Sequence, residues 1–281
     1  MRDTFIEELS KRAVLDPSIF LITGDLGFGV LEDFARTFPD QFLNAGVAEQ
    51  NMTAIAAGMA IEGRKVFTYS IGNFPTLRCL EQIRNDVCYH DLDVTIVSIG
   101  GGFSYGQLGM SHHATEDLGI MRSLPGITTV APCTAWETYE ATKTLTLNHG
   151  VGYLRIEKGG IQRPINNEIK YKLGESIQMR PGDDLSIIVT GGIMEECLKA
   201  SMELEKKGVN ARVISMHTIK PIDIDAIKRS SKETGHIVCV EEHNKYGGLS
   251  SAVSEVLVEN SLSCKFASVS IDDTYSAVVG S

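Results

Sequence analysis

The sequence predicts two α/β domains, each a mostly parallel sheet between two layers of helices. Three observations favour this fold class. Short apolar runs typical of buried strands alternate with segments of helical period. A polar stretch rich in Gly, Pro and Asn interrupts this alternation after Ile156. The length of 281 residues is also typical of two domains. We therefore expect a first domain at 1–160, a linker with one or two short strands at 161–182, and a second domain at 183–281.

The first domain alternates helices and strands from its beginning. The expected strands are Ser18–Thr23, Gln41–Ala45, Lys65–Ser70, Asp93–Ile99, Thr128–Val130 and Tyr153–Ile156. The expected helices are Asp3–Val14, one from about Glu49, one from about Pro75, Gly119–Leu124 and Ala135–Leu147, with a short helical connection around Phe34 and Phe38. After Pro75, apolar residues recur at helical period and predict one buried face, made by Leu77, Leu80, Ile83 and Val87.

The second domain repeats the alternation on a smaller scale. Its expected strands are Leu185–Thr190, Ala211–Ser215, His236–Val240 and Lys265–Val269. Its expected helices are one that opens at Gly191 and Gly192 and ends before Gly208, then Asp223–Ser231 and Leu249–Glu259. Strands that alternate with helices indicate a parallel sheet here too.

Composition excludes several classes of function. The net charge of −10 argues against a general nucleic-acid surface, although a local basic cluster can still bind a small anion. No apolar run approaches the roughly 20 residues that span a bilayer, and the charged N-terminus is unlike a signal peptide. The six cysteines are scattered without a CxxC pair, which indicates reduced thiols, no zinc site and a cytoplasmic protein.

One carboxylate, Glu49, opens the segment NAGVAEQNMTAIAAGMA at 44–60. A small-residue turn precedes it, and the helix that follows carries an apolar stripe made by Met52, Ile55, Ala56 and Met59. Burial disfavours a charged carboxylate at this place, whereas the helix N-terminus favours it. For an arbitrary helix, the ordinary interpretation is an acid that complements the helix dipole.

The motif GVAEQNMTAIAAGMA resembles the pyrimidine-binding segment of the transketolase family of thiamine-diphosphate enzymes. The resemblance covers most of the chain. It implies a pyrimidine-binding domain followed by a transketolase C-terminal domain. It further implies that Glu49 hydrogen-bonds the aminopyrimidine ring, so that the ring's imino form removes the proton from the thiazolium carbon. A buried glutamate suits this role because it shares a proton with the ring nitrogen.

Asp25 lies in the turn Gly24–Gly27, at the carboxyl end of the first predicted strand, where parallel α/β sheets bind ligands. The alternative is an Asp that caps a helix or supports the turn. In the family the matching Asp lies by the cofactor and the dimer interface, so the resemblance implies a cofactor-binding role for Asp25.

An aromatic residue that stacks on the aminopyrimidine ring is expected after the third strand. Phe74 is the candidate by its position, with Tyr69 and Phe67 as alternatives. An ordinary core phenylalanine is the competing interpretation.

The glycine-rich stretch Gly100–Asp117 contains the adjacent histidines His112 and His113. His112 and Glu116 have the i, i+4 spacing of a metal pair, but no third ligand is obvious and we expect no metal site here. The segment resembles a transketolase loop in which the residue matching His112 lies near the substrate carbonyl and stabilises or shuttles protons to the developing alkoxide. His113 is a second candidate. Leu108 replaces an acid found in many sugar transketolases, which leaves the donor open.

Arg155 ends the last strand of the first domain, where the resemblance implies an arginine that binds the acceptor phosphate. The alternative is an Arg155–Glu157 pair at the surface.

In the second domain, Glu241, Glu242 and His243 follow a strand, in a pattern that resembles a domain concerned mainly with assembly.

The sequence contains no GDG motif, which in this family begins the site for the diphosphate and its Mg²⁺. The chain therefore resembles the C-terminal subunit of a split, two-chain transketolase. The resemblance implies an N-terminal partner subunit that holds the diphosphate and metal, and self-association into the core of a heterotetramer. The sequence ends where relatives usually continue through one more short helix.

The resulting prediction is a cytoplasmic enzyme that transfers a two-carbon ketol unit between sugars, such as sugar phosphates, once its partner is bound. Alternatives are a subunit like the β chain of a 2-oxoacid dehydrogenase E1, a deoxyxylulose-phosphate-synthase-like subunit, and a non-catalytic assembly protein. The histidine pair favours sugar chemistry. Glu49 argues against loss of catalysis, because a scaffold would not require an acid there.

Overall fold

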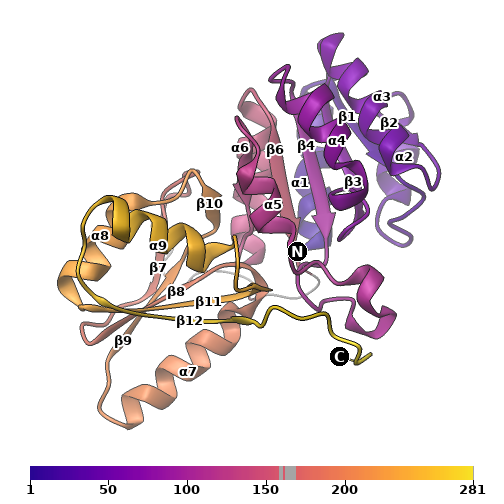
Figure 1. Cartoon of the computed structure of the whole chain (residues 1–281). Coiled ribbons are helices and arrows are strands. Elements are labelled where there is room, and N and C mark those ends of the chain that lie inside the picture. The colour runs from indigo at the N-terminus through magenta and orange to yellow at the C-terminus, as the bar shows by residue number, and fades with distance from the viewer. Residues whose placement is uncertain (158–160, 162–168, 281) are drawn as a thin grey trace.

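A seven-stranded sheet in the order β10-β5-β6-β4-β3-β1-β2 forms the centre of the first unit (Figure 1). The computed structural model describes residues 1–157, 161 and 169–280. All neighbouring strands are parallel except β10, which pairs antiparallel with β5. The strands are β1 Ile19–Thr23, β2 Phe42–Asn44, β3 Lys65–Ile71, β4 Val94–Ile99, β5 Thr128–Val130, β6 Gly152–Ile156 and β10 Thr218–Lys220.

Helices cover both faces of this sheet because its central strands are apolar on both sides. β1 and β4, for example, are buried along their whole length. One face packs against α3 Glu49–Ile61, the helical segment 77–88 and α5 Asp117–Ser123. The other packs against α1 Arg2–Leu15, α2 Glu32–Thr37 and α6 Ala135–Leu147.

The second unit is a five-stranded sheet in the order β12-β11-β8-β9-β7. Helix α7 covers one face, and α8 and α9 cover the other (Figure 1). The strands are β7 Ile177–Arg180, β8 Leu185–Val189, β9 Ala211–Ser215, β11 His236–Asn244 and β12 Lys265–Ile271. The helices are α7 Met194–Lys206, α8 Ile224–Glu233 and α9 Leu249–Glu259. The fold class predicted from the sequence, two mostly parallel α/β sheets between helices, is confirmed.

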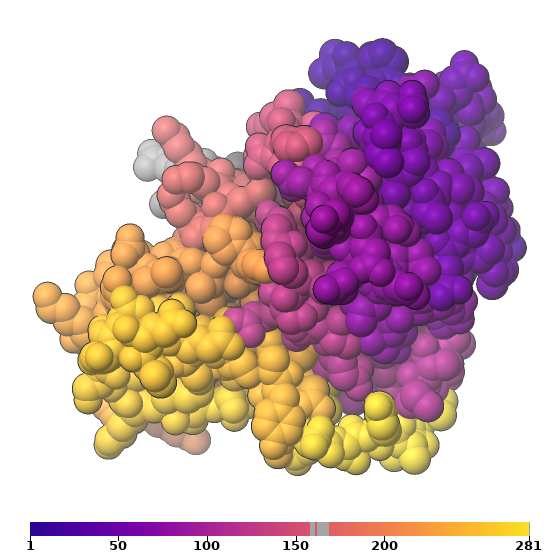
Figure 2. Space-filling view, turned by 45° about the horizontal axis from the view of Figure 1, so that its top comes forward, coloured from indigo at the N-terminus to yellow at the C-terminus, as the bar shows by residue number. Residues whose placement is uncertain are grey.

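The two units share one core. The apolar cluster around Met52 and Ile83 of the first unit continues through Ile227 and Val253 of the second. Strand β10 belongs to the second unit in sequence but completes the first sheet. The C-terminal tail, yellow in Figure 2, runs along the loop that follows β4.

The prediction of one continuous helix from about Pro75 is wrong. The chain forms a 3₁₀ turn at Leu77–Cys79, a single α-helical turn, α4, at Leu80–Gln82 and a π-helical turn at Ile83–Cys88. Changing the hydrogen-bond pattern twice rotates the side chains away from the 3.6-residue period. Ile83 and Val87 are buried as expected, but Leu77 is exposed.

Two strands depend on pairing that local patterns do not reveal. β10 is absent from the elements expected from the sequence, and it is ordered by its antiparallel partner β5. β7, the short strand expected within 161–182, pairs antiparallel with β9. No helix among the described residues combines the length and apolar character needed to cross a membrane.

Candidate active site

The loops that follow β1, β3 and β4 leave the first sheet at its carboxyl-end edge, where parallel α/β sheets bind ligands. The loop after β1 contains Asp25, that after β3 contains Phe74, and that after β4 contains His112 and His113. Glu49 begins α3, the helix that follows the edge strand β2. The parallel topology therefore brings these four predicted segments to one edge of the sheet.

Glu49 is the first residue of α3 and is only 1% exposed. Its side chain packs against Gly24, where an added Cβ would lie 3.1 Å from the Glu49 Cγ. The glycine thus leaves room for the carboxylate. Glu49 Oε2 accepts a hydrogen bond of 2.6 Å from Arg78 Nη1. The carboxylate is consequently buried, paired and held close to the end of β1.

Arg78 joins Glu49 to the predicted aromatic residue. Its guanidinium carbon lies 4.6 Å from the centroid of the Phe74 ring, and its side chain is 45% exposed. The Phe74 ring in turn meets the His112 ring edge-on, with centroids 5.1 Å apart. The structure therefore groups Glu49, Phe74 and His112 around Arg78, a residue that the sequence reasoning missed.

The alternative aromatic candidates lie in the core. Phe67 and Tyr69 are buried in β3 and their rings pack on Phe5 of α1, with centroids 6.2 and 6.1 Å away. Burial raises the pKa of Tyr69. Of the three aromatic residues considered, only Phe74 contacts the Glu49 cluster.

The two histidines of the loop point into different surroundings. His112 is half-buried at the end of a 3₁₀ turn, Met110–His112, with its Nδ1 3.0 Å from Ser111 Oγ. Burial, followed by the neighbouring His113, lowers the pKa of His112, so the neutral ring is favoured. His113 is buried, and its ring meets the Phe103 ring edge-on with centroids 4.9 Å apart.

His113 borders a cavity of about 470 Å³. The cavity lies between the segment after β3, the histidine loop, α5 and the C-terminal tail, and its lining includes Asn73, Leu77, Phe103, Thr115 and Tyr275. The Asn73 amide donates to the main-chain oxygen of His113 and ties the two loops together. This cavity has room for a small polar molecule beside the His113 ring.

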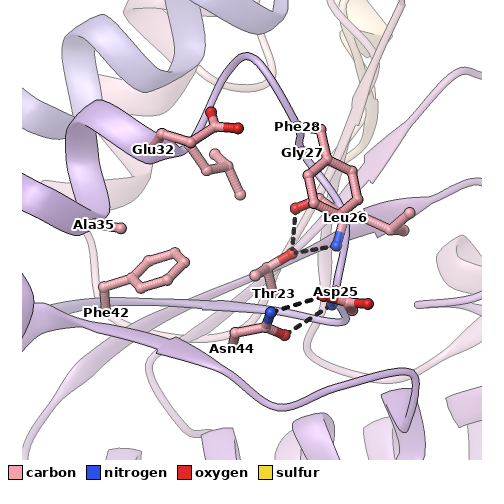
Figure 3. Close-up of a pocket in the computed structure, with 10 residues that line it drawn as sticks. Thr23, Asp25, Leu26, Gly27, Phe28, Glu32, Ala35, Phe42 and Asn44 are labelled. Carbon is pink, nitrogen blue, oxygen red and sulfur yellow. Dashed lines mark hydrogen bonds between the residues drawn. The ribbon is translucent and has the colours of Figure 1, made fainter.

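Asp25 is exposed at the rim of a smaller cavity of about 150 Å³ (Figure 3). Its φ of 59° lies in the left-handed region that a residue with a side chain rarely adopts. Two hydrogen bonds with Asn44 hold it: Asp25 N–H donates to Asn44 Oδ1 at 3.0 Å, and Asn44 Nδ2 donates to Asp25 Oδ1 at 2.9 Å. The turn-supporting interpretation therefore has a structural basis, and Asp25 remains beside Gly24, which contacts Glu49.

Arg155 is placed away from this cluster, at the junction of the two units. Its guanidinium donates to Glu157 Oε1 at 3.1 Å, to Asp117 Oδ1 at 3.4 Å and to the main-chain oxygen of Glu242 at 2.8 Å. Burial alone would lower the pKa of Arg155, but the two carboxylates outweigh it and raise that pKa. The Glu157 pair weighed from the sequence is present, in the interior and not at the surface. The Arg155 side chain is only 2% exposed, and these three groups already accept hydrogen bonds from its guanidinium.

The fold and this site are typical of the α/β proteins that bind ligands at the carboxyl ends of parallel strands. The model of the transketolase pyrimidine-binding domain matches residues 1–162, and that of the transketolase C-terminal domain matches residues 174–278. The chain belongs to the transketolase family, which confirms the identification made from the sequence.

Several relatives are, by their names, subunits or sections of transketolases. One subunit of the apulose-4-phosphate transketolase of Phocaeicola vulgatus is 37% identical over 261 residues, which cover 92% of this chain and 84% of that protein. A putative transketolase C-terminal section of Methanocaldococcus jannaschii is 38% identical over 278 residues, covering 98% and 87%. The solved structure of a split gene transketolase, described as an inactive beta4 tetramer, has a TM-score of 0.88 at 33% identity, covering 97% and 89%.

Proposed function

We propose that this chain activates thiamine diphosphate within a two-chain transketolase, and that the complex transfers a two-carbon ketol unit between sugars. The observation that carries the proposal is the buried Glu49 carboxylate at the edge of a parallel sheet, within a cluster that contains an aromatic ring. Membership of the transketolase family supports the cofactor.

The residues of this chain fit the aminopyrimidine end of the cofactor. The contacts of Arg78 test this fit, because its guanidinium is flat like an aminopyrimidine. The guanidinium donates N–H to Glu49 and packs against the Phe74 ring. A flat aminopyrimidine has the same requirements, an acid for its ring nitrogen and an aromatic neighbour. Glu49 and Phe74 would hold it there, and Asp25 would stand at the rim of the site.

Glu49 would share a proton with the ring nitrogen and so control the protonation of the exocyclic amine. Burial suits this task, because water does not compete for the carboxylate. When bound, the cofactor would supply the nucleophilic carbon for the donor carbonyl. His112, with its lowered pKa, would be neutral near pH 7 and able to donate or accept a proton at the substrate oxygen. His113 would contact the substrate from the cavity side.

The diphosphate and Mg²⁺ are assigned to a partner subunit. The sequence contains no GDG motif, and the described residues contain no group of three or more His, Cys, Asp or Glu placed to hold a metal ion. An N-terminal transketolase subunit that bears this motif would complete the site. Self-association of the present chain would then place two such sites in a heterotetramer.

The substrate would be a sugar phosphate or another modified sugar. The name of the Phocaeicola relative specifies apulose 4-phosphate, a phosphorylated sugar. Arg155 receives no substrate-binding role, since the groups that it contacts already use its guanidinium. Comparison of hydroxypyruvate with pyruvate as donor separates ketol transfer from 2-oxoacid decarboxylation and from deoxyxylulose-phosphate synthesis.

The test is reconstitution with a GDG-bearing transketolase subunit from the same genome. We expect thiamine diphosphate and Mg²⁺ to bind the mixture, measured by calorimetry, and neither chain alone. In the complex, Glu49→Gln should lower turnover by roughly 10²–10⁴-fold, the range of a lost acid–base group, without altering the far-ultraviolet circular dichroism.

Glu62→Gln is the matched control, because Glu62 is an exposed acid at the opposite end of the same helix. It should leave turnover unchanged. Normal turnover of the Glu49→Gln complex would refute the proposed role of this acid.

A further inference from the structure

The end of β11 approaches the histidine loop of the first unit. Asn244 N–H donates to the main-chain oxygen of Thr115 at 2.7 Å, and Gly119 N–H donates to His243 Nε2 at 3.2 Å. The second unit thus touches both the histidine loop and the start of α5. His243 and the adjacent Asn244 make these contacts, at the end of the Glu241-Glu242-His243 stretch, for which the sequence predicts no catalytic role.

Glu242 contacts Phe103, a residue of the histidine loop beside the candidate site. Its Oε1 accepts a hydrogen bond of 2.8 Å from the N–H of Phe103. An added Cβ at Gly102 would lie 2.4 Å from the Glu242 Cγ, so the carboxylate side chain fits closely against bare backbone. On its other side, the main-chain oxygen of Glu242 accepts from Arg155. Glu242 is therefore held by the first unit at both its side chain and its backbone.

Phe103 transmits this contact to the candidate site. Its backbone is bound by Glu242, while its ring meets the His113 ring edge-on at 88°, with centroids 4.9 Å apart. Both rings line the cavity of about 470 Å³. A displacement of the Phe103 backbone would move the Phe103 ring and remove its packing contact with the His113 ring.

We propose that Glu242 is a positioning residue of the second unit, which sets the orientation of His113 through Phe103 and so tunes substrate binding. The expected effect on substrate binding rests on the proposed function. The expected effect on the orientation of His113 does not. A carboxylate suits the task because a charge-assisted bond to a backbone N–H is stronger than a neutral one. The second unit would then contribute to substrate recognition as well as to assembly.

The kinetic test uses the reconstituted complex. Glu242→Ala should raise the KM for the donor sugar, at most by about tenfold, because the lost hydrogen bond acts on the substrate only through Phe103 and His113. It should leave the Kd of thiamine diphosphate unchanged. Glu242→Gln keeps an acceptor oxygen and should restore most of the affinity. Glu255→Ala is the control, because Glu255 pairs with Arg122 across the same two units without contacting the histidine loop.

A second measurement does not depend on activity. In the chain with selectively labelled histidine, the His113 ring signals, assigned by their absence in His113→Gln, should shift in Glu242→Ala and in Phe103→Leu. They should stay in place in Glu255→Ala. Because Phe103→Leu leaves the Glu242 contact intact, it remains informative where Glu242→Ala folds poorly.

The outcomes separate the two proposals. A wild-type complex without ketol transfer would refute the proposed function, and the histidine signals would still test the positioning role. An active complex in which Glu242→Ala changes neither the donor KM nor the His113 signals would overturn the inference. Additive effects of Glu242→Ala and Phe103→Leu on KM would also overturn it, since residues on one path are expected to couple.

Discussion

Arg78 shows how a single side chain can stabilise a buried acid. Glu49 is almost completely enclosed, and a carboxylate in that position is costly unless a donor or cation compensates it. Arg78 supplies both a hydrogen bond and a positive charge, and the Phe74 ring supports the guanidinium from one side. A ligand that binds Glu49 must therefore displace or rearrange this arginine.

Removal of the arginine should destabilise the chain. Arg78→Ala leaves the Glu49 carboxylate buried without its partner, and we expect the free energy of unfolding to fall by about 1–3 kcal/mol. Urea denaturation of the chain measures this change. The double variant Arg78→Ala, Glu49→Gln should recover part of the loss, because the uncompensated charge is then absent.

Arg84→Ala is the control, since Arg84 lies in the same helical segment but is exposed, and its side chain donates a hydrogen bond to the neighbouring Asn85. It should be close to neutral. Equal stability of Arg78→Ala and the wild type would mean that solvent, and not Arg78, compensates Glu49.

Single residues could be predicted where local sequence determines their place. The position of Glu49 at the start of a helix follows from the turn before it and the apolar stripe after it. The partners of Glu49 and Arg155 could not be predicted in this way. Arg78 is 29 positions from Glu49 along the chain, and Arg155 is enclosed by groups from α5, from the end of β6 and from the second unit.

The residues at which helix α6 begins and ends are determined by the sequence next to them. Thr134 Oγ1 accepts from Glu137 N–H at 3.0 Å, and Glu137 Oε2 accepts from Thr134 N–H at 3.2 Å, which forms a capping box. The predicted range Ala135–Leu147 is confirmed. The segment after Pro75 differs because its π-helical turn depends on packing, which no periodicity rule includes.

The capping box should make stability depend on pH. Burial raises the pKa of Glu137 to about 7, above its ordinary value of 4.5. The folded state therefore holds a proton that the unfolded state releases between these two values, and stability falls as pH rises across that range. Relative to Glu137→Gln, the wild type should lose about 3 kcal/mol of unfolding free energy from pH 4.5 to 7.

Chemical denaturation of both proteins at several pH values measures this difference. Glutamine is the matched replacement because it keeps an acceptor for the capping box. The comparison also cancels the opposite contribution of His217, whose pKa burial lowers to about 4 and which destabilises the fold as pH falls from 6.5. A constant difference between the two proteins would mean that Glu137 is ionised in the fold.

At the scale of the whole molecule, the two units are joined by more than a linker. β10 crosses from the second unit into the first sheet, and the apolar cluster is continuous between them. The alternation of strands and helices was sufficient to predict two α/β units. It could not predict β10, because a three-residue strand has no period of its own and is ordered by pairing with β5.

Arg155 lies where the two units meet, and its removal should weaken both together. Arg155→Met leaves the Asp117 and Glu157 carboxylates buried without their cation, which should lower the free energy of unfolding by about 3–5 kcal/mol. Hydrogen exchange of the amides of β4, which is buried along its whole length, reports the first unit. Hydrogen exchange of the β8 amides reports the second.

Because the units share a core and a sheet, we expect both probes to follow one transition in the wild type, and both to shift equally in Arg155→Met. Arg212→Met provides the comparison, since Arg212 pairs with the half-exposed Glu233 within the second unit. β8 amides that kept their protection while the β4 amides lost theirs would show that the second unit folds by itself. The junction at Arg155 would then fix the orientation of the units without contributing to their stability.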